Sequence, residues 1–158
     1  TLGVVFVSIM IMFIFLFRSL YLAFIGMIPN LLAASVVLGT MGWMKVPLDI
    51  MTITVAAISI GMAVDNTIHY VHRFKLEFKK TSNYELSMQN SHRTIGRAMF
   101  YTSSTIIIGF LVLVTSNFNP TVYFGLFVSL AMFMALMGAL TLLPQLLMIL
   151  KPLGKEAS

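Results

Sequence analysis

One acidic residue inside a long apolar run most constrains how this chain can fold. The run begins near Ile50, passes through Gly61 and reaches about Val71, with Asp65 inside it. A charged side chain at the centre of a membrane-spanning helix costs roughly 2.5–3.5 kcal/mol, and such residues usually face a bundle interior or a water-filled path. The rest of the chain should therefore shelter this carboxylate, a group that can also take up and release a proton.

The composition indicates an integral membrane protein. Of the 158 residues, 59% are hydrophobic and 9% are charged, whereas soluble domains have about 25% charged residues. The absence of cysteine excludes disulfides, thiolate metal sites and cysteine nucleophiles. The basic residues lie between apolar runs, so the net charge of +5 indicates membrane topology rather than nucleic-acid binding.

No motif of a soluble enzyme is present, since there is no phosphate-binding loop and no nucleophile elbow. We therefore expect no enzyme activity and no cofactor, and any transport should run on an ion gradient. Thr1 already lies inside an apolar run, without a basic segment before it. We read this start as a truncation and expect the chain to be a fragment of something larger.

Five apolar runs predict an all-α, polytopic membrane bundle of five transmembrane helices, forming a single domain over residues 1–158. Each run approaches the roughly 20 residues that a span needs. Between the third and fourth runs, the basic segment 73–97 predicts one cytoplasmic amphipathic helix, with Phe74 and Phe78 on the membrane surface and Lys75 and Lys79 in water. The predicted spans are 2–17, 22–43, 50–71, 98–116 and 122–150.

The basic residues predict the orientation. If the five spans alternate, nine of the ten Lys and Arg residues fall on one side and only Lys45 falls on the other. The positive-inside rule makes the first side cytoplasmic. The sequence thus predicts a multi-pass protein of the cell inner (plasma) membrane with a cytoplasmic C-terminus.

Polar residues on two predicted spans form a candidate proton path. Asp65, His69 and His72 share one helical face at i, i+4 and i+7, and the fourth span carries four consecutive hydroxyl residues over 102–105. Two spans with polar patches tend to meet, because each polar group then finds a partner away from lipid. We expect Asp65 and Asn66 to hydrogen-bond with some of these hydroxyls. The candidate proton-relay residues are Asp65, Asn66, His69, Thr102, Ser103 and Thr105.

Each of these groups also has a purely structural explanation. Ser and Thr in a helix can bond carbonyl groups of their own helix. His69 and His72 lie near the expected interface, where histidines can act as anchors instead of proton carriers. This pair has no cysteine and no further histidine nearby in sequence, so we expect no metal site.

The stretch Gly61-Met-Ala-Val-Asp-Asn-Thr-Ile-His-Tyr-Val-His-Arg-Phe74 resembles the fourth-helix motif of the resistance-nodulation-division (RND) superfamily. It looks most like the branch of predicted lipid and hydrophobic-compound exporters related to the MMPL proteins. Other stretches resemble this branch in the same order, over essentially the whole chain. They are Ile28-Pro-Asn-Leu-Leu32, Val46-Pro-Leu-Asp49, Arg93-Thr-Ile-Gly-Arg-Ala98 into Tyr101-Thr-Ser103, Gly109-Phe110, Phe124-Gly125 and Leu142-Leu-Pro144.

The resemblance implies proton-driven export with Asp65 as the protonatable residue. RND proteins have two similar halves, each with one helix, a large extracytoplasmic domain and five more helices, and this chain resembles the last five helices of the second half. The implied partners are protons, membrane lipids, the missing N-terminal half and the extracytoplasmic domains, and a homo-oligomer is compatible. This chain departs from the family pattern in two places, and both reduce the charge of this half. It has Asn66 where relatives often have Asp or Tyr. It also lacks the acid that relatives often have in the last helix, where Gly138, Ala139 and Thr141 stand here.

Three other functions remain open. An accessory membrane subunit of the Sec export machinery shares the Gly-Met-Ala-Val-Asp part of the motif, but usually continues without the His-x-x-x-Arg ending. A lipid- or sterol-sensing module would bind without pumping. A structural membrane scaffold would show no transport at all.

Overall fold

The protein is described by a computed structural model over residues 2–46 and 50–155. These residues form helices joined by short turns, without any strand, so the predicted all-α membrane bundle is confirmed. Of the stretch Val46-Pro-Leu-Asp49, the last three residues lie outside the described ranges. The elements are α1 (Leu2–Phe17), α2 (Leu20–Trp43), α3 (Ile50–Thr81), α4 (Tyr84–Ser91), η1 (His92–Gly96), α5 (Arg97–Val112), η2 (Leu113–Thr115), α6 (Asn119–Met137), η3 (Gly138–Leu142) and α7 (Leu143–Leu150).

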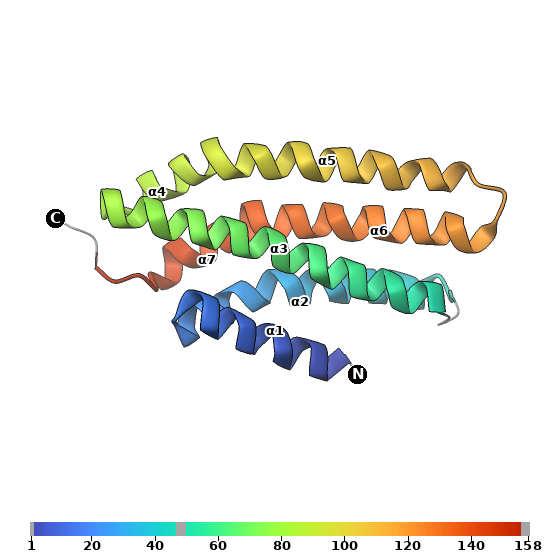
Figure 1. The fold of residues 1–158 in the computed structure, drawn as a ribbon, viewed down its shortest axis with the longest axis horizontal. Helices are drawn as coiled ribbons and strands as arrows, with labels where there is room; N and C mark the ends of the chain where they lie inside the picture. Colours follow the sequence, from blue (N-terminus) through green and yellow to red (C-terminus); the bar gives the residue numbers. More distant parts are fainter. Residues whose placement is uncertain (1, 47–49, 156–158) are drawn as a thin grey trace.

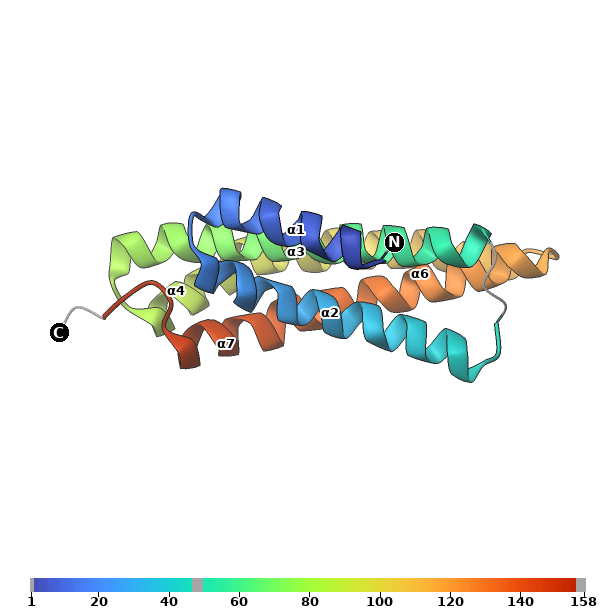
Figure 2. The same ribbon diagram turned by 90° about the horizontal axis from the view of Figure 1, so that it is seen from below.

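The long helices run side by side along one axis of an elongated bundle (Figure 1). α5 packs along α6, and α6 in turn contacts α2 and α3. α1 packs mainly on α2, and the view turned by 90° shows it beside α3 as well (Figure 2). Because α6 is the main neighbour of α5, the hydroxyl-bearing helix and the helix of the acidic motif do not form the close pair that the sequence predicted.

The ends of α1 and α2 lie within two residues of the first two predicted spans. Within the described residues, three helical stretches are long and apolar enough to cross a membrane, and α1 is a shorter apolar helix. α3 exceeds its predicted span, because it continues beyond Val71 to Thr81. The three long apolar stretches are Leu20–Trp43, Tyr84–Thr115 and Asn119–Leu150.

The segment 73–97 differs in form from the single amphipathic helix predicted for it. Its first part is the end of α3, and after a turn at Ser82 it continues as α4, whose first turn is capped by the Asn83 side chain accepting from the Leu86 N–H at 3.1 Å. Phe74 and Phe78 are buried in this helical hairpin against the Tyr84 ring, with ring centroids 6.1 and 4.4 Å away. The aromatic rings thus pack within the protein instead of lying on a membrane surface.

Two glycines allow the closest helix contacts. A Cβ at Gly125 of α6 would lie 2.5 Å from the Phe110 carbonyl oxygen of α5, a distance that real Cβ atoms do not adopt. A Cβ at Gly26 of α2 would lie 3.1 Å from Cγ2 of Thr67 on α3. Small residues at helix interfaces let backbones approach closely in membranes, and these two positions fix how α5, α6, α2 and α3 pack.

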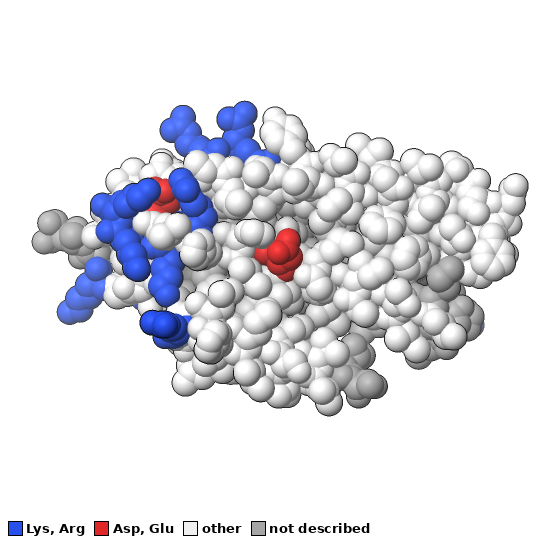
Figure 3. Space-filling view, in the orientation of Figure 1, with Lys and Arg blue, Asp and Glu red and all other residues white. Residues whose placement is uncertain are grey.

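The basic residues gather at one end of the bundle (Figure 3). The turn at Arg18, the hairpin of α3 and α4, and the end of α7 at Lys151 all lie at this end, whereas Lys45 follows the opposite end of α2. The grouping of nine basic residues apart from Lys45 therefore agrees with the sequence pattern. We call this part of the molecule the basic end.

Candidate functional site

Asp65 lies on the outer face of α3, not in the interior of the bundle. Its side chain is 69% exposed, and its partner is His69, one turn further along the same helix. The distance from Asp65 Oδ1 to His69 Nε2 is 3.4 Å, and the His69 side chain is itself 58% exposed. One turn before Asp65, a Cβ at Gly61 would have nothing within 4 Å. The motif thus presents an acid, an imidazole and a bare backbone position on one open face, which we call the Asp65 face.

The predicted hydrogen bonds between this motif and the fourth span are wrong. Thr102 Oγ1 donates to Ala98 and Met99 carbonyls, and Thr105 Oγ1 donates to the Tyr101 carbonyl, all within α5. Ser103 is buried, but its hydroxyl has no hydrogen-bond partner in the described part of the chain. The physical reason is the packing order, since α5 lies against α6 and Asp65 points away from the interior.

Asn66 points inward, unlike its neighbour Asp65. It is only 6% exposed, and its Nδ2 atom has no hydrogen-bond partner among the described residues. A buried amide without a partner costs about 1–3 kcal/mol. Asp65 and Asn66 therefore do not act as a pair, because consecutive helix positions face different sides.

The inward face of the motif is joined to α2 through Thr67. The Thr67 hydroxyl lies 3.2 Å from Asn30 Oδ1 and 3.0 Å from the Ala63 carbonyl, and Asn30 Nδ2 donates to the Gly26 carbonyl at 2.9 Å. Asn30 follows Pro29, whose ring removes one backbone donor from α2. This buried polar contact holds the α3 motif at a fixed rotation against α2, which keeps Asp65 on the opposite, outward face.

His72 lies on the same exposed side of α3 as Asp65 and His69. In the part of the chain that the structure describes, no three His, Asp or Glu side chains lie together in a group that could hold a metal ion. Among the described residues, the acid that pairs with His69 is Asp65. A carboxylate and an imidazole placed in this way can share a proton or pass it from one to the other.

The third histidine, His92, was missed by the sequence reasoning. Its Nε2 atom lies 2.9 Å from the Leu140 carbonyl of η3, and its Nδ1 atom lies 2.9 Å from the Tyr70 hydroxyl of α3. Because a carbonyl only accepts, Nε2 donates, and the Tyr70 hydroxyl can donate to Nδ1. Both η1 and η3 are π-helical turns, which often occur at functional sites. No spacing in the sequence indicates this contact, because Tyr70 and Leu140 lie 22 and 48 residues away from His92 in the chain.

Glu77 is a second buried acid that the sequence reasoning did not single out. Its carboxylate is 7% exposed and lies 2.8 Å from Arg73 Nη2 and 3.6 Å from Lys80 Nζ. Asn90 of α4 also donates to it at 3.3 Å. The i+4 spacing from Arg73 was visible in the sequence. This cluster joins α3 to α4 at the basic end and serves packing of the hairpin.

Gly138, Ala139 and Thr141, near which the resemblance implied an acid, are small for a packing reason. A Cβ at Gly138 would lie 3.2 Å from Cβ of Pro29, and Ala139 is also buried. The Thr141 hydroxyl donates to the Met137 carbonyl of its own helix. An acid at Gly138 would be buried against Pro29 without space for its side chain.

These observations define a polytopic helical membrane protein with one outward-facing acid on its central motif helix. The sequence model of the MMPL family matches residues 1–156, and the chain belongs to this family. It is 29% identical over 143 residues to MJ1562 of Methanocaldococcus jannaschii, whose name describes it as a membrane protein. That match covers 90% of this chain and 37% of the relative, so the chain spans just over a third of the relative's length. No solved structure matches the chain.

Proposed function

We propose that this chain is the transmembrane part of a proton-driven exporter of lipids or other hydrophobic compounds, located in the inner (plasma) membrane with its basic end in the cytoplasm. Asp65 takes up and releases the proton, and His69 is its exchange partner. The observation that carries the proposal is the Asp65–His69 pair on an exposed face of a helix in an MMPL-family membrane bundle.

The exposure of Asp65 supports a second membrane unit on the same face. A carboxylate that met lipid there would cost roughly 2.5–3.5 kcal/mol at the centre of a span. Gly61 leaves room for close approach of another helix, as small residues do at helix interfaces in membranes. The covering unit is the other transmembrane half of the full-length protein, or a second copy of this chain. The proton path then runs between the two units, and Thr102, Ser103 and Thr105 lie outside it.

The experiment compares the full-length protein with its Asp65→Asn variant in proteoliposomes. A trapped pH-sensitive dye reports proton movement under an imposed pH gradient, and the hydrophobic fluorophore phenylnaphthylamine reports export. Asp65→Asn keeps the side-chain shape but cannot carry a proton, so both signals should fall to the level of empty vesicles. Glu85→Gln is the matched control, because Glu85 is an exposed acid on α4, away from the motif.

Proton-coupled export that survives in Asp65→Asn would contradict the pump. The alternative of a lipid- or sterol-sensing module predicts binding of the lipid by both proteins with no proton flux in either. If the protein were instead an accessory subunit of protein export, even the unaltered protein would export no fluorophore.

A further inference from the structure

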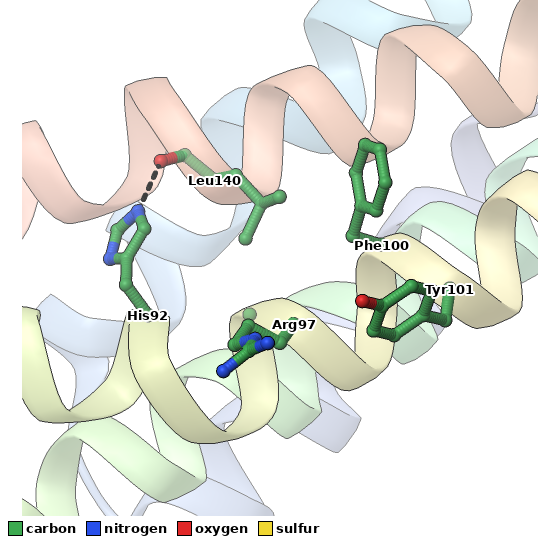
Figure 4. A pocket seen from close by; sticks show the side chains of 6 residues that line it. His92, Arg97, Phe100, Tyr101 and Leu140 are labelled. Atoms are coloured by element: carbon green, nitrogen blue, oxygen red, sulfur yellow. Dashed lines mark hydrogen bonds between the residues drawn. The ribbon is translucent and has the colours of Figure 1, made fainter.

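An open pocket of about 260 Å³ lies between α5 and the π-helical turn η3, and neither Asp65 nor His69 lines it. Arg97, Phe100 and Tyr101 line it from α5 and Leu140 lines it from η3, with the Arg97 guanidinium turned away from Leu140 (Figure 4). His92 and Gly96 complete its lining. We call it the Arg97 pocket.

We propose that the Arg97 pocket binds the phosphate headgroup of an anionic phospholipid from the surrounding bilayer. This lipid is a structural lipid that stays bound to the protein, and it differs from the exported compound. The inference does not rest on the proposed pump, because it uses residues that are separate from Asp65 and His69.

The charge of the pocket fits an anion. Among the residues that the structure describes, Arg97 has no carboxylate partner, although the buried acid Glu77 on the neighbouring hairpin is paired with Arg73 and Lys80. A guanidinium presents a planar set of donors that matches a phosphate group and forms charge-assisted hydrogen bonds with it. His92 does not compete for the ligand, because both of its ring nitrogens already have partners in the protein.

The depth of the pocket fits a lipid at the membrane boundary. Arg97 is the last charged residue before the apolar part of α5, and Phe100 and Tyr101 follow it by one turn, with 51% and 63% of their surfaces exposed. Aromatic residues, and tyrosine in particular, are favoured at headgroup level because their rings are apolar and the hydroxyl is polar. The headgroup would meet Arg97 while the acyl chains extend past Phe100 into the bilayer.

The size of the pocket also favours a headgroup. Sites that enclose a whole small molecule usually have volumes of about 300–1,000 Å³, and this pocket is smaller and open on one side. It can hold a phosphate with part of its glycerol, while the chains remain outside. Leu140 and Gly96 lie close together at its base, since a Cβ at Gly96 would be 3.4 Å from Leu140 Cδ2.

Native mass spectrometry of the full-length protein tests the proposal. The protein is reconstituted in vesicles of equal parts phosphatidylglycerol and phosphatidylcholine, extracted, and its retained lipids are counted. The unaltered protein should retain phosphatidylglycerol in preference, and Arg97→Gln should lower its occupancy about tenfold, the effect of losing one charged contact. Arg97→Lys should retain more of this lipid than Arg97→Gln, and Phe100→Ala should retain less than the unaltered protein.

Arg93→Gln is the matched control, because Arg93 is an exposed cation one turn earlier that does not line the pocket. It should retain phosphatidylglycerol as the unaltered protein does. Equal losses in the two Arg→Gln variants would overturn the proposal in favour of a diffuse basic surface, and unchanged retention in Arg97→Gln would overturn it outright. Displacement of the lipid by inorganic phosphate at a concentration no higher than that of the lipid would instead indicate a site for a free anion, which also contradicts it. Because Arg97, Phe100 and Tyr101 are exposed, helicity measured by circular dichroism should be unchanged in all variants.

Discussion

Gly61 offers a perturbation that affects the assembled protein but not the fold of this chain. Within this structure a Cβ at Gly61 has nothing within 4 Å, so a leucine there has space. Replacing glycine by leucine inside a helix should even gain roughly 0.5–1 kcal/mol of helix propensity. The variant Gly61→Leu should therefore fold at least as well as the unaltered chain.

The result changes if a second membrane unit covers the Asp65 face, as we propose. The added side chain would then enter a packed interface, where overpacking costs typically about 1–3 kcal/mol. A loss of that size corresponds to a fall of roughly 5- to 150-fold in the population of the correctly packed state. We expect gradient-driven proton flux in proteoliposomes to fall by a similar factor, with the thermal unfolding temperature unchanged or higher.

Gly109→Leu provides the control for this experiment. Gly109 is an exposed glycine within α5, and a Cβ there also has nothing within 4 Å. This variant should retain full proton flux. If Gly61→Leu transports as well as Gly109→Leu, nothing packs on the Asp65 face and the reasoning is refuted.

Three further predictions concern the fold and are read by thermal unfolding in detergent. Gly125→Ala should destabilise by about 1–3 kcal/mol, because its Cβ would meet the backbone of α5, whereas Gly109→Ala should be neutral or stabilising. Glu77→Ala should cost about 1–3 kcal/mol, because it removes the buried carboxylate that pairs with Arg73 and accepts a hydrogen bond from Asn90; an equal effect of Glu85→Ala at an exposed site would contradict this. His92→Ala should cost a similar amount, because it removes the contact between Tyr70 and η3, and an unchanged midpoint would show that this contact is not structural.

Hydropathy predicted the helix positions well because the bilayer sets the length of an apolar span. The first helix was predicted over residues 2–17 and occupies Leu2–Phe17, and the predicted end of the second at Trp43 is the end of α2. Charged residues that follow these apolar runs, such as Arg18, mark where each predicted helix ends.

Hydropathy could not predict which face of each helix turns inward. In membranes the lipid is as apolar as the protein core, so an apolar helix carries no inside–outside periodicity. The expected contact of Asp65 with Ser103 failed for this reason, since the structure pairs α5 with α6. The hairpin of α3 and α4 was missed because Phe74 and Phe78 have the same spacing whether they pack on Tyr84 or on a membrane surface.

The central claim is that the Asp65 face is covered by protein in the full-length protein and does not face lipid. These 158 residues contain no cysteine, so, with any cysteine elsewhere in the full-length protein replaced by serine, a single spin label can be attached at Gly61→Cys, with Gly109→Cys as the exposed reference. The measurement is the collision rate of each label with oxygen, which concentrates in the bilayer, by electron paramagnetic resonance in reconstituted membranes. The account predicts a much lower collision rate and slower motion of the label at position 61 than at position 109. Equal, high collision rates at both positions would contradict it.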